Sequence, residues 1–146
     1  MQIKPIEERN QDTLNRLIEI WRSAVVKTHT FLSEVDIAAI EPIVKLGLEG
    51  VKNLIGFYAD SNTLQGFIGV ENKKIEMLFI DAAYRGRGAG KQLVNYAVTH
   101  LDAEYVDVNE QNEQGVGFYF HMGFQLISRS ELDEQGRPFP ILHLKL

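Results

Sequence analysis

The sequence predicts an α/β protein of the α+β type, built on a twisted, mixed and mostly antiparallel sheet of about seven strands with four helices. Three runs rich in strand-forming residues, 53–59, 64–71 and 74–80, are separated only by DSNT and NK, which predicts an antiparallel meander. A segment of helical periodicity then joins 74–80 to a short strand at 105–109. This strand-helix-strand unit predicts one central parallel pair with a right-handed crossover.

The elements before the meander are an edge strand and two helices. The stretch QIKPI alternates polar and apolar residues and tolerates Pro5 at a sheet edge. Apolar residues recur every three or four positions from Asn10 to Lys27 and again from about Asp36 to Leu48, a spacing that is typical of amphipathic helices. We expect Gly50 to lie just beyond the end of the second helix.

The elements after the meander complete the fold class. Helical spacing returns from Gly88 to Leu101, and a short helix is expected over 114–122. Gly123 follows it, at a position where a helix C-terminus favours a left-handed residue. Two strands, 124–132 and 140–146, form a last hairpin across DEQGRPF. Since no repeat or linker interrupts the chain, we expect one domain over residues 1–146.

Composition excludes several classes of protein. The chain has no cysteine, which excludes disulfides, thiolate catalysis and cysteine-based metal sites. No apolar run approaches the roughly 20 residues that span a membrane, and MQIKPIEERN lacks the apolar segment of a signal peptide, so we expect a cytoplasmic protein without a membrane partner. The net charge of −5 argues against a nucleic-acid partner, although a local basic patch is able to hold one phosphorylated ligand.

Such a patch occurs in YRGRGAGKQL, where the predicted strand 74–80 gives way to a helix. Bare backbone before a helix N-terminus lets several N–H groups point at one anion, and flanking basic side chains add charge for a ligand with more than one phosphate. A tight turn with solvated basic residues is the other interpretation of the glycines alone. The patch consists of Arg85, Gly86, Arg87, Gly88, Ala89, Gly90 and Lys91.

Two nucleotide-binding motifs do not fit this segment. A P-loop needs a glycine and a serine or threonine at positions that Arg85 and Gln92 occupy. The dinucleotide fingerprint needs its third glycine at the position of Lys91, although Asp107 lies at about the right distance for a ribose contact. We therefore expect neither ATP nor NAD at this loop.

Two motifs in order resemble those of the GNAT superfamily of acetyl-CoA-dependent N-acetyltransferases. The first is Arg-x-x-Gly-x-Gly after the strand KIEMLFID, and it starts at Arg85. The second, VNEQNEQGVGFYFHMGF, is similar to the family's Asn-x-x-Ala-x-x-Phe-Tyr-x-x-x-Gly-Phe, with Gly115 in place of the usual alanine. Its matching residues are Asn112, Phe118, Tyr119, Gly123 and Phe124. The segments WRSAVVKTHTFLS and VNEQNEQGVGFY further resemble the YjaB-like bacterial branch.

This resemblance implies the GNAT fold and transfer of the acetyl group of acetyl-CoA, the co-substrate, to a primary amine of a small molecule or protein by direct attack. The alternative function is a non-catalytic acyl-CoA-binding regulatory module. GNAT proteins often dimerise, so a homodimer is a further expectation. In the family the glycine loop holds the pyrophosphate, and the strand before it holds the pantetheine arm. The implied cofactor-binding residues are Leu78, Phe79, Ile80, Arg85, Gly86, Arg87, Gly88, Ala89, Gly90, Lys91 and Asn112.

Acetyl transfer needs a donor for the charge on the thioester oxygen and a proton for the leaving thiolate. A backbone N–H within 78–80 meets the first need, provided that the neighbouring strand 105–109 splays away and leaves this donor unpaired. The family assigns the second role to the tyrosine that matches Tyr119. Without the motif, Tyr119 would be interpreted as an aromatic residue that packs beside Phe118 and Phe120.

The acceptor amine needs a base, for which Glu76, His29 and water are the candidates. Strand alternation places Glu76 on the face opposite Ile75, Met77 and Phe79. Acidic residues at this position often act as the base in the family. An ordinary polar residue on the solvated face of a strand is the other interpretation of Glu76.

The segment THTFLS supplies the expected substrate-binding residues, His29 and Phe31. The imidazole of His29 titrates near neutral pH in its unperturbed state, and this loop lies over the acceptor site in the family. Phe31 is a candidate wall of the acceptor pocket. Asn112 either caps the following helix or touches the cofactor. The remaining histidines lack the spacing of metal ligands, so we expect no metal.

Overall fold

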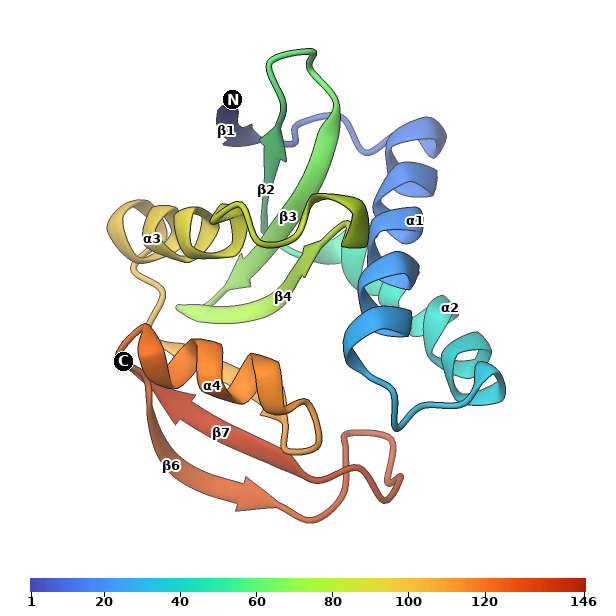
Figure 1. Ribbon diagram of the computed structural model, residues 1–146, viewed down its shortest axis with the longest axis vertical. Helices are drawn as coiled ribbons and strands as arrows, with labels where there is room; N and C mark the ends of the chain where they lie inside the picture. The colour runs from blue at the N-terminus through green and yellow to red at the C-terminus, as the bar shows by residue number, and fades with distance from the viewer.

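The computed structural model describes residues 1–146 and has the expected fold class, a seven-stranded mixed sheet with four α-helices (Figure 1). The strands are β1 (Gln2–Pro5), β2 (Asn53–Tyr58), β3 (Leu64–Glu71), β4 (Lys74–Ile80), β5 (Tyr105–Asn109), β6 (Gln125–Ser130) and β7 (Ile141–Lys145). The helices are α1 (Gln11–Thr28), α2 (Glu34–Gly50), the short 3-10 helix η1 (Ala82–Tyr84), α3 (Ala89–Leu101) and α4 (Glu113–His121). Every predicted strand and helix is present, and each bound lies within two residues of its predicted place.

The strands follow the order β1-β2-β3-β4-β5-β7-β6 across the sheet. Strands β1 to β4 are antiparallel neighbours, which confirms the predicted meander. Strand β5 joins β4 in parallel, which confirms the central parallel pair. Strand β7 lies between β5 and β6 and is antiparallel to both. The sheet is therefore antiparallel at every contact except the one between β4 and β5.

Side-chain caps explain where the first two helices begin. The Oδ1 atom of Asn10 accepts the N–H of Thr13 at 3.0 Å, so α1 begins directly after Asn10. Ser33 and Asp36 form a capping box, in which each side chain accepts the other residue's backbone N–H. The box starts α2 at Glu34, two residues before the predicted start.

The end of α2 differs from the expectation for Gly50. The helix includes Gly50, and Val51 caps it by donating its N–H to the Gly47 carbonyl at 2.8 Å. Gly50 has no positive φ, so no left-handed turn is needed there. Gly123 after α4 does have a φ of +100°, as predicted. None of the helices combines the length and the apolar character needed to cross a membrane.

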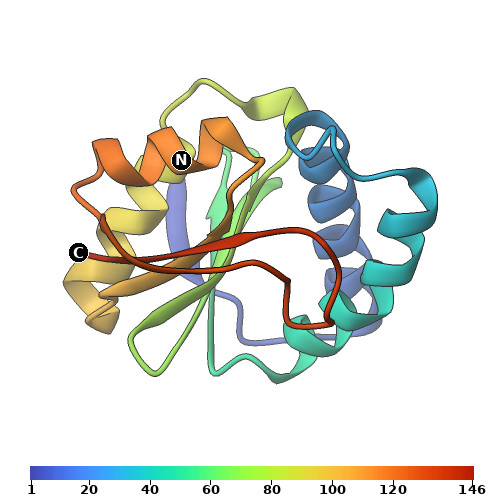
Figure 2. The same cartoon turned by 90° about the horizontal axis from the view of Figure 1, so that it is seen from below.

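Two hydrophobic clusters cover the two faces of the sheet. The larger one contains 16 buried residues and packs α3 and α4 against the strands, and its fully buried members include Leu93 and Val94. The other contains 12 buried residues and packs α1 and α2 against the opposite face, around Trp21 and Phe67. Figure 2 shows these two helix pairs on opposite sides of the strands. The sheet is thus the middle layer of the fold.

A β-bulge at Glu76 changes which side chains share a face of β4. The register with β3 skips Glu76, because the residues on either side of it pair with consecutive residues of β3. Ile75 consequently packs in the α3–α4 cluster, whereas Met77 and Phe79 pack in the α1–α2 cluster. The prediction that Ile75, Met77 and Phe79 share one face is therefore wrong, since strict alternation ends at the extra residue.

Candidate active site

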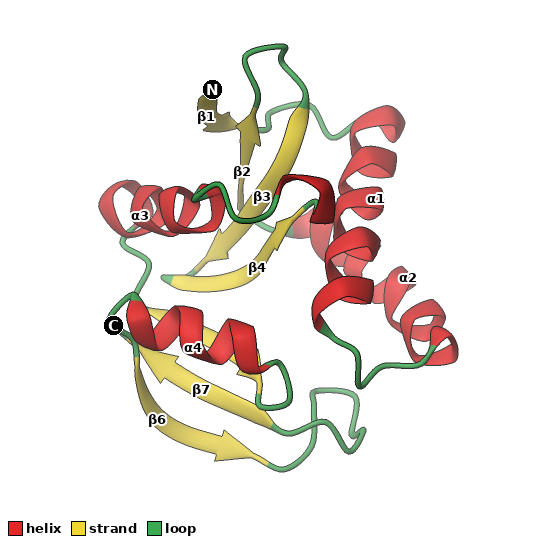
Figure 3. Ribbon diagram, viewed as in Figure 1, coloured by secondary structure: helices red, strands yellow, loops and turns green.

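Strands β4 and β5 pair only at their first residues and have no pair beyond them. In the view of Figures 1 and 3, α4 lies across the space between β4 and β7. The parallel register joins Lys74 with Tyr105 and Ile75 with Val106, and it contains no later pair. Strand β5 instead continues along β7, with which all five of its residues pair. Residues 76–80 of β4 therefore have a strand partner only on the β3 side, and the splay that the family resemblance implies is present.

The divergence leaves two backbone N–H groups of β4 without a strand partner. Asp81 donates its N–H to the Gln65 carbonyl, on the β3 side, at 2.9 Å. Successive residues of a strand direct their backbone groups to opposite sides, so Phe79 shares the direction of Asp81. Ile80 and Leu78 then point their N–H groups into the gap between β4 and β5. These are the donors that the candidate site offers to a ligand.

The glycine loop, residues 85–91, leads from η1 into α3 beside this gap. Gly86 and Gly88 have φ values of +77° and +80°, a left-handed conformation that favours glycine. Gly88 is the N-cap of α3 and has no side-chain oxygen, so the N–H groups of the first helical turn have no side-chain cap. A Cβ atom at Gly86 would meet no other atom within 4 Å. The loop therefore presents free donors to an open space, as an anion site requires.

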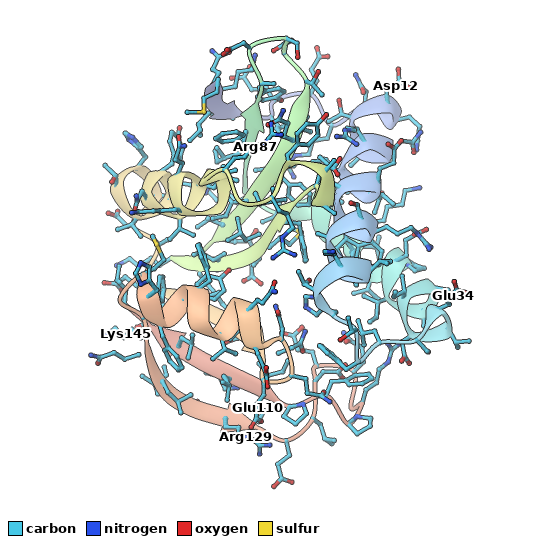
Figure 4. All side chains as sticks on the ribbon, in the orientation of Figure 1. Asp12, Glu34, Arg87, Glu110, Arg129 and Lys145 are labelled. Atoms are coloured by element: carbon cyan, nitrogen blue, oxygen red, sulfur yellow. The ribbon has the colours of Figure 1, made fainter.

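The basic residues of the loop point in two directions. Arg85 Nη2 donates to Gln114 Oε1 of α4 at 2.6 Å, and both Arg85 and Lys91 line the cavity beside the loop. The guanidinium of Arg87 instead lies over the Tyr84 ring, 5.7 Å from its centroid. Figure 4 shows Arg87 on the side of the loop away from α4. The structure brings Arg85 and Lys91 to the candidate site but does not bring Arg87 there.

An ion pair and two hydrogen bonds from α1 hold the start of η1, which leads into the glycine loop, and the sequence analysis did not predict these contacts. Arg16 Nη2 lies 2.9 Å from Asp81 Oδ2. Ser23 Oγ donates to Asp81 Oδ1 at 3.2 Å and accepts the N–H of Ala82 at 3.0 Å. Burial raises the pKa of Asp81, but its hydrogen bonds with the Ala83 N–H and with Arg16 outweigh burial and lower it. The only sequence signal was an acidic residue directly after a strand.

A cavity of about 340 Å³ gathers most of the predicted cofactor-binding residues between the loop, β4, α1 and α4. Arg87 is the one predicted member that does not line it. Thr28, His29 and Tyr119 complete the wall on the side of α1 and α4. The cavity combines an end rich in N–H donors with apolar walls along β4. This combination fits a ligand that has a phosphorylated head and an extended arm.

Tyr119 lies where this cavity meets the gap between β4 and β5. Its side chain is 7% exposed and packs edge-on against Phe118 and Phe124, with ring centroids 5.1 and 5.6 Å away. Burial raises the pKa of the Tyr119 hydroxyl, with no hydrogen bond to offset it. The phenol therefore stays protonated at neutral pH and is able to donate to a ligand.

Asn112 is both a helix cap and a wall of the cavity. Its Oδ1 atom accepts the N–H of Gly115 at 3.1 Å, which starts α4. A Cβ atom on Gly115 would lie 2.4 Å from Asn112 Nδ2. The alanine that is usual in the second motif therefore does not fit here unless the cap moves. The structure confirms the capping role, and because Asn112 also lines the cavity, its contact with the cofactor stays a prediction.

A narrower cleft of about 200 Å³ continues from the cavity into the gap between β4 and β5. The bulged residue Glu76 lines it together with His29 and Tyr119. Partial burial is the largest influence on Glu76 and raises its pKa, while the charge of Lys74 opposes this rise. Glu76 and His29 belong to no group of three side chains that could ligate a metal. The bulge thus places a carboxylate on the unpaired edge of β4.

His29 follows α1 and borders both the cavity and the cleft. Its Nδ1 atom lies 2.7 Å from Thr28 Oγ1, and burial lowers its pKa to about 4, so the ring is neutral at physiological pH. Phe31 lies 5.3 Å from the His29 ring and 5.8 Å from Phe139, but it lines a separate cavity. The two residues expected to bind the substrate therefore face different cavities.

Comparison with known proteins identifies the family of this chain. Residues 27–144 match the family model of the acetyltransferase (GNAT) domain. The chain belongs to the GNAT acetyltransferase family. It is 41% identical over 129 residues to the peptidyl-lysine N-acetyltransferase YjaB of Salmonella typhimurium, a match that covers 88% of each chain. It is 37% identical to the Escherichia coli K12 protein of the same name, with 88% of this chain and 86% of that protein covered.

Solved structures agree with this assignment. The apo form of YjaB from Escherichia coli has a TM-score of 0.87 at 34% identity, with 99% of this chain and 95% of that chain covered. The PaiA N-acetyltransferase from Thermoplasma acidophilum, solved in complex with coenzyme A, has a TM-score of 0.70 at 23% identity over the whole of both chains and shares the fold. This protein is accordingly an acetyl-CoA-dependent N-acetyltransferase rather than a non-catalytic binding module.

Proposed function

We propose that this enzyme acetylates lysine side chains of proteins and that its active site lies at the gap between β4 and β5. The observation that carries the proposal is the unpaired edge of β4, which lies between the glycine loop and Tyr119. The relatives named peptidyl-lysine N-acetyltransferases support lysine over a small amine as the acceptor. The narrow cleft beside Glu76 also suits a long, unbranched amine side chain.

The glycine loop would hold the pyrophosphate of acetyl-CoA, which supplies an activated acetyl group when bound. The N–H groups at the start of α3 have no side-chain cap and would bind one anion together, the helix dipole would add partial positive charge, and Arg85 and Lys91 would add full charges. The N–H groups of Leu78 and Ile80 would bond to the pantetheine arm as an added strand does. One of these donors would also stabilise the negative charge that develops on the thioester oxygen.

Tyr119 would donate a proton to the leaving sulfur. Burial keeps its phenol protonated, and the residue lines both the cavity and the cleft. A thiol has a pKa near ~8.5, so its thiolate leaves reasonably well even before it is protonated. We therefore assign Tyr119 a moderate share of the rate enhancement.

Glu76 would take the proton from the acceptor ammonium, directly or through water. A lysine amine has a pKa near ~10.4, so the reaction needs a base at neutral pH. The raised pKa of Glu76 strengthens it as a base, whereas the lowered pKa of His29 weakens its imidazole. His29 would instead form the wall that separates the acetyl group from solvent.

Three further parts of the proposal concern the chain as a whole. Residues 1–146 would act as one domain, because both hydrophobic clusters pack on the same sheet. The lack of cysteine is compatible with a reducing, cytoplasmic compartment. A homodimer is proposed on the family resemblance alone.

Mass spectrometry of acetylated peptides tests the acceptor. The purified enzyme and acetyl-CoA are incubated with peptides that carry one lysine and a blocked N-terminus, with matched peptides in which arginine replaces lysine, and with small polyamines. We expect the mass of one acetyl group to appear on the lysine peptides only, together with an equal amount of free thiol. Acetylation of the polyamines alone would replace lysine by a small-molecule acceptor. Saturable acetyl-CoA binding without any thiol release would contradict a catalytic role.

A further inference from the structure

Three side chains from neighbouring strands form a hydrogen-bonded chain that the proposed acetyl transfer does not use. His143 Nδ1 on β7 lies 2.7 Å from Asp107 Oδ1 on β5, and His143 Nε2 lies 2.7 Å from Ser130 Oγ on β6. Asp107 is the direct partner of His143 in the β5–β7 register. Ser130 pairs with Ile141, two residues from His143, so all three side chains project from the same face of the sheet.

The partners of His143 determine which of its ring nitrogens carries the proton. A carboxylate only accepts hydrogen bonds, so Nδ1 must donate to Asp107. In the neutral ring Nε2 then has a free lone pair and accepts the hydroxyl proton of Ser130. A serine that donates to a histidine oriented by a carboxylate is the arrangement of nucleophilic triads, which are recognised by geometry and not by fold.

A lysine holds the carboxylate of this chain in place. Lys74 Nζ lies 2.6 Å from Asp107 Oδ2, so each oxygen of Asp107 has its own partner. The side chains of His143 and Asp107 are 29% and 24% exposed. His143 and Asp107 are therefore shielded enough from solvent for their hydrogen bond to persist, yet they stay accessible to a small ligand.

The Ser130 side chain lines a second cavity, of about 350 Å³. This cavity shares no lining residue with the one beside the glycine loop, whereas Asp107 and Asn109 line both this cavity and the cleft beside Glu76. Six apolar side chains line it together with Ser130, His143 and Asp107, and they would accommodate an alkyl or acyl chain next to the hydroxyl. They are Phe31, Leu32, Ile40, Leu132, Phe139 and Ile141.

We propose that Ser130, His143 and Asp107 form a second, nucleophilic site that takes the acyl group of carboxylic esters with an apolar acyl chain. Ser130 Oγ attacks the ester carbonyl carbon while its proton passes to His143 Nε2. The bond from this carbon to the alcohol oxygen then breaks, and the proton on Nε2 passes to that oxygen. The products are an acyl ester of Ser130 and the free alcohol. Asp107 orients the imidazole and stabilises its protonated form, so it is a positioning residue.

Covalent labelling in the absence of acetyl-CoA tests this site. The folded protein is treated with an alkyl fluorophosphonate and, separately, with p-nitrophenyl butyrate, and each adduct is located by peptide mass spectrometry. We expect one adduct per chain, at Ser130. Ser130→Ala and His143→Phe should each lower the labelling rate at least about 100-fold. Ser128→Ala is the matched control, because Ser128 pairs with His143 across the sheet while Ser130 makes the hydrogen bond.

The positioning role of Asp107 is tested by two substitutions at this residue. Asp107→Asn should lower the labelling rate of Ser130 at least about 100-fold, because an amide can donate to Nδ1 of His143 and then holds the ring in the other tautomer. Asp107→Glu keeps a carboxylate and should recover part of the rate. Equal labelling rates in the two variants would contradict this role.

The outcomes separate the second site from acetyl transfer. An adduct at Ser130 that depends on His143 supports the site. No adduct, an equal adduct at Ser128, or an unchanged rate in His143→Phe would overturn it. Calorimetric titration with coenzyme A checks that each variant is folded, since the two cavities share no residue. Tyr119→Phe should label at the wild-type rate, so a failure of acetyl transfer does not affect this test.

Discussion

The two edges of β5 differ in how many residues pair with the neighbouring strand. Only the edge with fewer pairs borders the proposed active site. Along β7, every residue from Tyr105 to Asn109 has a partner. Along β4, two pairs form before the strands separate. The first edge continues the sheet, whereas the second leaves a cleft and two backbone donors. The proposed active site thus lies where the sheet is incomplete.

The separated edge of β4 is the reason why we expect an extended ligand with amide groups at the proposed site. A backbone N–H that is shielded from water and unpaired costs about 1–3 kcal/mol. A ligand that accepts hydrogen bonds from Leu78 and Ile80 would recover this free energy, as an added strand does. The paired edge of β5 has no such donors to offer.

Gly88→Glu should have the largest effect, because it blocks the loop that borders the gap. The new carboxylate would occupy the anion site and repel the phosphates, so we expect acetyl-CoA affinity in calorimetry to fall more than about 100-fold, or ~3 kcal/mol. Gly136→Glu is the matched control, because Gly136 also has a positive φ, +77°, with open space at Cβ, but lies in the β6–β7 loop. An acetyl-CoA affinity of Gly88→Glu equal to that of the wild type would contradict the assignment of the glycine loop to the cofactor site.

Glu76→Gln should have the next largest effect, because it removes the proposed base from the open edge of β4. We expect kcat/KM to fall about 100-fold at neutral pH, with little change in acetyl-CoA affinity. The activity of the wild type should decline as the pH falls and Glu76 becomes protonated, whereas the activity of the variant should not show this decline. Glu104→Gln, at the closed end where β4 and β5 still pair, should behave as the wild type. A full-rate Glu76→Gln enzyme would leave water or His29 as the base.

Tyr119→Phe should have a smaller effect, because the thiolate leaves without full protonation. We expect kcat to fall about tenfold, with acetyl-CoA affinity unchanged. Tyr105→Phe is the control, since this residue lies on the paired part of β5. Equal losses in kcat and in cofactor affinity would point to a packing role for Tyr119 instead of proton donation.

His29→Asn should have the smallest effect at neutral pH, where the ring of His29 is neutral, and its effect on stability should appear only in acid. The pKa of His29 is about 4 in the folded protein against an ordinary 6.5, so the unfolded chain takes up this proton first as pH falls. Relative to the variant, the wild type should lose at most about 3 kcal/mol of folding free energy between pH 6.5 and 4. Urea unfolding at several pH values measures the difference, with exposed His121→Asn as the control. A difference that stays constant with pH would contradict the burial of a neutral ring.

Local patterns were sufficient to predict the elements and the glycine loop. Helical spacing and turn residues placed every strand and α-helix within two residues, although not the 3-10 helix η1, because neighbours along the chain decide these features. The alternate glycines at 86 and 88 have positive φ values, as a bare-backbone cradle requires. The splay of β5 was expected from the family resemblance, and the strand register bears it out.

Features that depend on register and on contacts between distant segments were not predicted. The bulge at Glu76 reverses the faces of β4, and strict alternation cannot reveal one inserted residue. The direction of Arg87 and the separate cavity of Phe31 depend on packing between loops. The contact between Ser130 and His143 exists only because β6 pairs with β7 in one particular register.

Residue-resolved hydrogen exchange with and without coenzyme A tests the open edge of β4 most directly. The amides of Leu78 and Ile80 point into the gap, while that of Phe79 points toward β3. We expect saturating coenzyme A to slow exchange at Leu78 and Ile80 and to leave Phe79 unchanged. Unchanged exchange at both Leu78 and Ile80 in the fully bound protein would contradict the account, because the ligand would then lie elsewhere than along the unpaired strand.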